Sequence, residues 1–176
     1  MIRSDSLPSL FLIDFGLAQL FRNPATYLHI PFTTNHPIVG TLPFASINGQ
    51  QGNAQSRRDD LESLVYTIIY SALGDLPWNS KATGNNVKAV LHKKTSITAK
   101  ELCDGLPAPF CNFVTHVRSL GFDEKPDYEY LQTILSQCSG RAADQPVELL
   151  PLPSCSRVSV GSSPGSPTRP IFTGRV

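Results

Sequence analysis

The sequence predicts a mainly α-helical protein in which one helical domain is followed by a disordered tail. Three observations lead to this prediction. Apolar residues recur at the spacing of helix faces between residues 56 and 139, a long stretch without any period precedes them, and a proline- and serine-rich stretch follows. A chain of 176 residues with 40% apolar composition is long enough to bury one core.

The longest predicted helix runs from Asp60 to Gly74, with apolar residues at the spacing of one helix face and more on its other sides. Asp59 or Asp60 can cap its free N–H groups, and Gly74 can end it in the left-handed conformation. Thr98 and Glu101 form the capping-box pattern of a second helix. Further helices are predicted from the cap or turn residues Asn85 or Asn86, Pro107 and Asp127.

Residues 19–55 contain four prolines and no helical or strand period, so they are predicted to form a long loop. Loops of that length inside compact domains are usually functional or mobile. Before this loop, Leu10–Ile13 has the pattern of a short buried strand and leads directly into Asp14-Phe15-Gly16. An acid after a strand, with glycine two places on to let the backbone turn, is suited to hold a hard cation such as Mg²⁺.

The C-terminal stretch has a different composition from the rest of the chain. Residues 140–176 hold six prolines and six serines, with a single aromatic residue. Such a stretch buries too little apolar surface to offset the entropy lost on ordering. We therefore expect a domain over residues 1–139 and a disordered tail over residues 140–176.

Charge and cysteine content exclude several classes of protein. Fifteen basic and fourteen acidic residues give a net charge of +1, so no global field attracts nucleic acid or a membrane. No apolar run approaches a membrane span or a secretory signal, which predicts an intracellular protein, cytoplasmic or nuclear. The four cysteines form no C-x-x-C pair that would suggest zinc, and Cys111 and Cys138 are predicted to pack in the core.

Several motifs follow Asp14-Phe15-Gly16 in a fixed order, and together they resemble the casein kinase 1 family of serine/threonine protein kinases. Members of that family carry Ser-Ile-Asn where most protein kinases have Ala-Pro-Glu. The matching segments are Gly40-Thr41, Ser46-Ile47-Asn48, residues 55–64, Leu76-Pro77-Trp78 and residues 118–131. The resemblance covers roughly residues 10–137. It implies the helical C-terminal lobe of a protein-kinase-like fold, with the long loop as activation segment.

The resemblance also implies roles for individual residues. Asp14 would bind the Mg²⁺ that bridges the ATP phosphates, with Phe15 and Gly16 completing the cofactor-binding turn. Thr41 would support the catalytic aspartate, although it can equally be a turn residue. Asp60 would cap the long helix and brace the catalytic loop. Arg57 and Arg58 are interpreted only as a solvated or phosphate-tolerant patch at the start of that helix.

The departures from the family pattern concern the catalytic parts. Thirteen residues precede Asp14, and the chain contains no G-x-G-x-x-G loop, no V-A-I-K-like run and no H-R-D motif. We therefore expect the isolated chain not to phosphorylate substrates. Leu42-Pro43 stands where the family usually places a basic residue, so recognition of a priming phosphate is not expected. Val65 replaces a glycine that is usual in the long helix.

Three interpretations remain open at this point. The chain can be a partial casein-kinase-1-like kinase, whose family reaction is phosphoryl transfer from Mg-ATP to a protein substrate. It can instead be a non-catalytic, pseudokinase-like module that binds a protein partner. It can also form an active kinase with a separately made N-terminal half. In each case we expect the long helix to expose apolar side chains that an upstream segment would cover.

Overall fold

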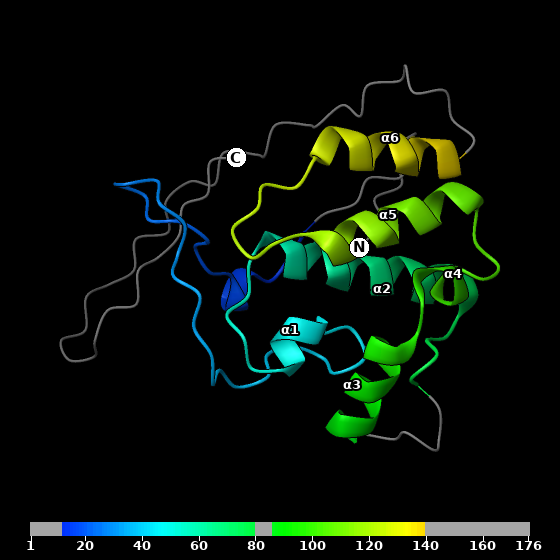
Figure 1. Ribbon diagram of the computed structural model, residues 1–176, viewed down its shortest axis with the longest axis horizontal. Coiled ribbons are helices and arrows are strands. Elements are labelled where there is room, and N and C mark those ends of the chain that lie inside the picture. Colours follow the sequence, from blue (N-terminus) through cyan, green and yellow to red (C-terminus); the bar gives the residue numbers. More distant parts are fainter. Residues whose placement is uncertain (1–11, 80–85, 140–176) are drawn as a thin grey trace. The chain divides into compact units, whose positions relative to one another are not determined.

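The computed structural model describes residues 12–79 and 86–139, and this part of the chain is helical (Figure 1). It contains no strand, and its one isolated antiparallel bridge joins Arg22 to His29. The elements are η1 (Phe15–Leu17), α1 (Ile47–Gln50), α2 (Arg57–Leu73), α3 (Val87–Ser96), α4 (Ala99–Leu102), α5 (Ala108–Ser119) and α6 (Tyr128–Cys138). The predicted mainly α fold is confirmed.

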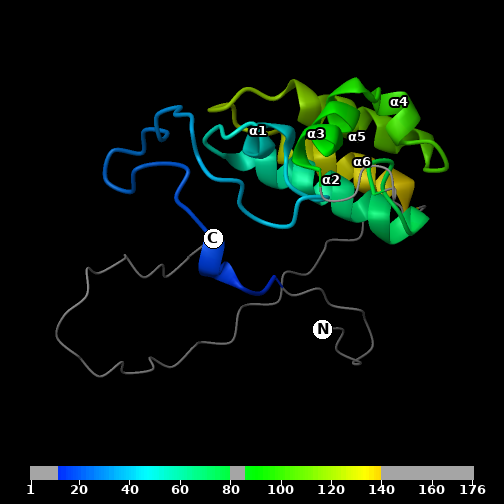
Figure 2. The same ribbon diagram turned by 90° about the horizontal axis from the view of Figure 1, so that it is seen from below.

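The helices pack in layers around α5. Helix α5 contacts α2 on one side and α6 on the other, while α4 packs against α5 (Figures 1 and 2). The short helix α1 lies against both α2 and α3. The core between these elements is built on large side chains that are almost completely buried, among them Tyr66, Ile69, Trp78, Phe113 and Val114. This core holds α2 in place, and the loop that precedes α2 packs against it.

Helix α2 begins three residues earlier than the sequence predicted. Its N-cap residue is Ser56, and the carboxylate of Asp59 accepts a hydrogen bond from the Ser56 N–H at 2.8 Å. The prediction that Asp60 caps this helix is therefore wrong, because the reciprocal capping contact belongs to the third residue of the first turn. Gly74 ends the helix with φ of 81°, as predicted.

Three other predicted helix starts are confirmed by their cap contacts, and α5 follows Pro107 as predicted but without a side-chain cap. The side chain of Asn86 accepts from the N–H of Ala89 at the start of α3. Thr98 and Glu101 form the predicted capping box of α4, although that helix is only four residues long. Asp127 accepts from the N–H of Tyr130 and opens α6.

Two predictions about the N-terminal third need correction. Leu10 and Phe11 of the predicted strand lie outside the described residues, while Leu12 and Ile13 form no strand and are 83% and 71% exposed. No described segment supplies a ladder partner, and an unpaired strand is not stable by itself. The loop of residues 19–55 is also interrupted by α1, which is capped by Ser46. The predicted tail, residues 140–176, lies outside the described part.

The outward side of α2 exposes several large apolar side chains among polar ones. Leu64 and Tyr70 are each 42% exposed, and Leu73 is 45% exposed. These side chains agree with the expectation that this helix presents more apolar surface than its described neighbours cover. Among the described residues, no helix is both long and apolar enough to cross a membrane.

We expect the Phe113→Ala substitution to reduce the free energy of unfolding by about 3–5 kcal/mol, because it leaves a cavity beneath α2. Phe113 is 1% exposed, and its ring stacks on Phe110 with centroids 5.6 Å apart. Urea denaturation followed by circular dichroism measures the loss. The matched control is Leu64→Ala on the exposed side of α2, which should cost clearly less. Equal losses for the two variants would contradict this packing.

Candidate functional site

The Asp14-Phe15-Gly16 turn is tight and solvent-exposed. Asp14 adopts a left-handed conformation with φ of 63° and ψ of 76°, and its Oδ1 accepts from the Gly16 N–H at 3.2 Å. Asp14 thereby caps the 3-10 helix η1. Its second carboxylate oxygen has no hydrogen-bond partner within the described residues, which leaves an oxygen ligand of the kind that Mg²⁺ prefers.

The backbone at Gly16 passes close to the Asp14 carboxylate, so a larger residue there would have to push that side chain aside. A Cβ at Gly16 would lie 3.1 Å from Asp14 Oδ1, tighter than nearly all real contacts of that kind. Phe15 projects into solvent and is 65% exposed. Within the described part, η1 contacts none of the six α-helices. The turn is thus formed by local contacts alone.

Thr41 lies in a second turn, after Gly40. Gly40 has φ of 90°, a conformation that favours glycine. The Thr41 carbonyl accepts from the N–H groups of Phe44 and Ala45 at 2.9 and 3.1 Å. Its hydroxyl is exposed and makes no hydrogen bond to any described residue. The structure therefore shows the turn role of Thr41 and brings it into no hydrogen bond with Asp14.

The segment after this turn is bound to the start of α2 by buried polar groups. The Ser46 hydroxyl donates to Asp59 Oδ1 at 2.7 Å and accepts from the Gly49 N–H at 2.9 Å. The Ile47 N–H donates to Glu62 Oε2 at 3.2 Å. Ser46 and Asp59 are each 1% exposed. A hydroxyl and a carboxylate from distant parts of the chain thus satisfy each other in the interior.

Sequence reasoning missed Lys94, which lies on α3 and reaches the same segment. It is fully buried, and its amine donates to the carbonyls of Leu42 and Ala45. One sequence signal could have found it. Val90, Lys94 and Ile97 follow the spacing of a buried helix face, and a lysine in such a row needs specific partners.

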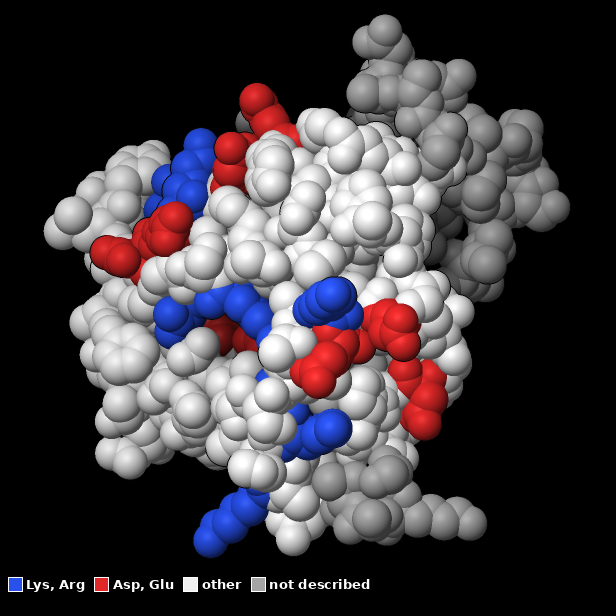
Figure 3. All heavy atoms as spheres, turned by 45° about the vertical axis from the view of Figure 1, so that its right-hand side comes forward, with Lys and Arg blue, Asp and Glu red and all other residues white. Residues whose placement is uncertain are grey.

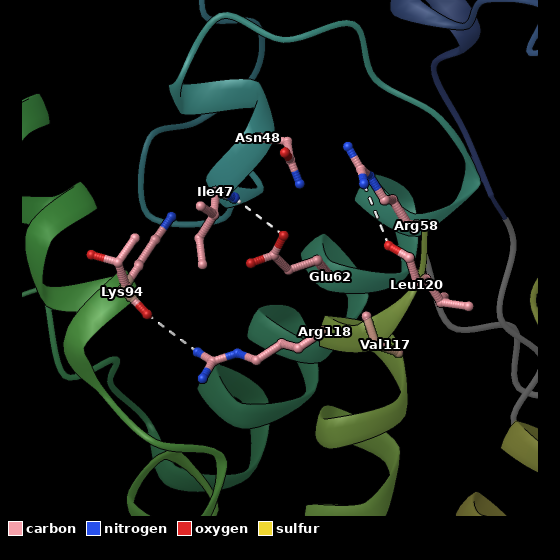
Figure 4. A pocket seen from close by; sticks show the side chains of 9 residues that line it. Ile47, Asn48, Arg58, Glu62, Lys94, Val117, Arg118 and Leu120 are labelled. Carbon is pink, nitrogen blue, oxygen red and sulfur yellow. Dashed lines mark hydrogen bonds between the residues drawn. The ribbon is translucent and has the colours of Figure 1, made fainter. Parts of the chain in front are cut away.

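A pocket of about 290 Å³, lined by both polar and apolar side chains, lies between α1, α2, α3 and α5. Its lining includes Asn48, Arg58, Glu62, Lys94 and Arg118 (Figure 4). Arg118 donates to the carbonyls of Ile97 and Lys94. On the face seen in Figure 3, basic and acidic side chains border one another without a continuous patch of either sign.

Burial governs the titration of the groups around this pocket. It raises the pKa of Glu62, and the hydrogen bonds from the Tyr66 hydroxyl and the Ile47 N–H oppose that rise. Burial also raises the pKa of Tyr66, with the neighbouring Glu62 carboxylate adding to the effect. For Lys94, burial lowers the pKa to about 7, against the opposing charge of Glu62.

Arg57 and Arg58 are half-buried and contact other parts of the chain, so they are more than the solvated patch that was expected, whereas their phosphate tolerance stays a prediction. The Arg57 guanidinium donates to the Asp123 carbonyl at 2.8 Å and lies 4.4 Å from the ring centroid of Phe21. Arg58 Nε lies 3.7 Å from Asp59 Oδ2, and its Nη1 donates to the Leu120 carbonyl at 3.4 Å. Both guanidinium groups thus contact backbone carbonyls, and that of Arg57 also contacts an aromatic ring. Through Arg57 and Phe21, the loop of residues 19–55 is attached to α2.

The three cysteines within the described residues pack in or against the core, as the sequence predicted for Cys111 and Cys138, whereas Cys155 lies outside the described part. Cys103 is buried, and Cys111 and Cys138 are half-buried against the core. Burial raises the pKa of Cys103 to about 12, which makes that thiol a poor nucleophile at neutral pH. In the part of the chain that the structure describes, no three His, Cys, Asp or Glu side chains are grouped to hold a metal ion.

We expect Asp59→Ala to lower the free energy of unfolding by about 2–4 kcal/mol, since a buried carboxylate that accepts from Ser46 and Ser56 is removed. Asp60→Ala is the matched control. Asp60 is exposed and accepts no hydrogen bond from any described residue, so removing it should cost nothing measurable. Urea denaturation of both variants checks this, and an equal or larger loss for Asp60→Ala would refute the assignment of the cap.

Comparison with known proteins identifies the family. No protein-family model matches the chain. Over 127 residues it is 43% identical to casein kinase I homolog 2 of Schizosaccharomyces pombe. This stretch covers 70% of the present chain and 29% of the yeast protein, so the chain spans less than a third of the relative it matches. By this likeness and by its helical fold, the chain belongs to the casein kinase 1 family of protein kinases.

Proposed function

We propose that this chain is the C-terminal-lobe part of a casein-kinase-1-like serine/threonine protein kinase. The reaction of such a kinase transfers the γ-phosphoryl group of Mg-ATP to a serine or threonine hydroxyl of a protein substrate. The observation that carries this proposal is the 43% identity to a casein kinase I homolog. It is supported by the Ser46-Ile47-Asn48 segment, which forms a capped turn bound to Asp59.

In this proposal Asp14 supplies one ligand to the Mg²⁺ that accompanies ATP. The exposed turn presents a carboxylate with one oxygen bound by the Gly16 N–H and the other without a hydrogen-bond partner among the described residues. One carboxylate matches the chemistry of Mg²⁺, but Mg²⁺ keeps an octahedral shell and also needs substrate phosphates and further ligands. The residues of this chain therefore contribute to such a site without completing it.

Thr41 is proposed to support the catalytic aspartate of the family. Its exposed hydroxyl and the turn that its carbonyl closes suit a residue beside the reacting groups. The next residues, Leu42 and Pro43, offer no cationic side chain, and their carbonyls already accept bonds from Gln50, Lys94 and Trp78. We therefore propose that this segment does not recognise a priming phosphate.

The isolated chain is proposed to be inactive. Phosphoryl transfer depends on positioning the nucleotide and neutralising its charge, which in protein kinases requires a Gly-rich loop, a strand lysine and a catalytic loop. None of these motifs is present in the 176 residues. Asp14 without them has neither a base nor an adenine pocket beside it, so a separate segment would have to supply both.

A second candidate function is favoured by the exposed apolar side chains. Leu12, Ile13, Phe15 and Leu17 are between 65% and 83% exposed at the start of the described chain. Together with the outward side of α2 they form surface that proteins normally cover. A non-catalytic module that binds a protein partner would use this surface, and so would a complementing N-terminal half. A stable monomer in sedimentation experiments would favour the module over the partial kinase.

Mg-ATP should not raise the melting temperature of the purified chain, because one carboxylate provides too little binding free energy to stabilise the fold measurably. Thermal shift with and without Mg-ATP measures this. Asp14→Ala is the control and should behave identically. A shift in the wild-type chain that disappears in Asp14→Ala would show a working nucleotide site and overturn the proposed inactivity.

A further inference from the structure

A buried lysine of α3 donates hydrogen bonds to the backbone of the segment after Thr41. Lys94 Nζ donates to the Leu42 carbonyl at 3.0 Å and to the Ala45 carbonyl at 2.7 Å. The side chain is completely buried, although lysine is among the residues least often found inside proteins. These two bonds join α3 to a segment about fifty residues earlier in the sequence.

Two further donors hold neighbouring carbonyls of the same segment. Trp78 Nε1 donates to the Pro43 carbonyl at 2.9 Å, and Gln50 Nε2 donates to the Leu42 carbonyl at 2.9 Å. The Lys94 amine also lies 4.8 Å from the ring centroid of Tyr66 and 5.1 Å from that of Trp78. We call Lys94, Trp78 and Gln50, with the carbonyls of residues 42, 43 and 45, the carbonyl tether.

The amine of Lys94 is not neutralised by an acid. Among the described residues no carboxylate lies within 4.0 Å of this amine. The one ion pair in the described part of the chain joins Arg58 to Asp59 and does not involve Lys94. The charged or titratable groups on the helices around it are Glu62 of α2 and Arg118 of α5, which Figure 4 shows, and Tyr66 of α2. Its partners are carbonyls and aromatic faces, which bind a charged amine less well than a carboxylate does.

We propose that Lys94 is a positioning residue of the kinase, whose amine fixes the backbone of residues 42–45 with a strength that depends on the charge of that amine. That these residues face the protein substrate rests on the proposed function. The tether itself rests on the contacts above. Because the segment follows Thr41 directly, loosening it would displace the groups that the proposal places next to the reacting hydroxyl.

The direction of the pH effect follows from linkage. In the tethered state burial lowers the pKa of Lys94 to about 7, whereas a lysine released into water keeps its ordinary pKa near 10.5. The released state therefore binds more protons between these values. As the pH rises above about 7 the tethered state gains population, by up to about tenfold per pH unit. Below pH 7 the ratio of the tethered to the released state stays constant.

The chain contains a single tryptophan, so the tether has its own spectroscopic signal. We would measure the solvent exchange of the Trp78 indole N–H by NMR between pH 6.5 and pH 9, divided by the intrinsic exchange rate at each pH. In the full wild-type chain the protection should rise up to about tenfold per unit above pH 7. In Lys94→Met it should be independent of pH.

Lys93→Met is the matched control, since Lys93 is the exposed neighbour on the same helix and its loss should leave the pH profile unchanged. If Lys94→Met does not fold, Lys94→Gln keeps an N–H donor without a titrating charge and should give the same flat profile. A flat wild-type profile, or a rise that persists without Lys94, would overturn the proposal. Neither result involves ATP, so the tether and the kinase assignment can fail separately.

Discussion

The buried carboxylate of Asp59 is the contact on which the arrangement of the site depends. It accepts from the Ser56 N–H and from the Ser46 hydroxyl, so one group both starts α2 and binds the segment that carries α1. A charge inside a protein is costly unless it is fully hydrogen-bonded, and that condition fixes the relative position of its partners. The turn at Thr41 stands only a few residues before this contact and takes its position from it.

Lys94, which lies on α3, binds the same segment through its side chain. The carbonyls of Leu42 and Ala45 accept hydrogen bonds from its amine, while the Ser46 hydroxyl donates to Asp59, so consecutive residues are bound by a buried amine and a buried carboxyl group. By contrast, Asp14 lies in an exposed turn whose one side-chain hydrogen bond is local. The segment after Thr41 is thus preorganised by the core, whereas the conformation of the Asp14 turn depends on local contacts.

Local sequence signals were enough to predict most of the helices. Asn86, Asp127 and the Thr98–Glu101 pair predicted helix starts because caps act through near neighbours in sequence. The start of α2 was misplaced because the Ser56–Asp59 pair was not recognised as a capping box, although its spacing of three residues is a local signal that distinguishes Asp59 from Asp60. The partners of Lys94 could not be predicted, since they are backbone carbonyls that the sequence does not label. The predicted strand failed because strands need partners, which local sequence does not show.

Phosphoryl transfer by a chimera tests the central claim most directly. Residues 10–139 of this chain would be joined, in one polypeptide, to the residues that precede the matching stretch in casein kinase I homolog 2 of Schizosaccharomyces pombe. If this chain is a kinase C-terminal lobe with Asp14 as a Mg²⁺ ligand, the chimera transfers phosphate from Mg-ATP to a protein substrate and loses this activity in Asp14→Ala. A folded chimera that transfers no phosphate, or one that is equally active without Asp14, would contradict the account.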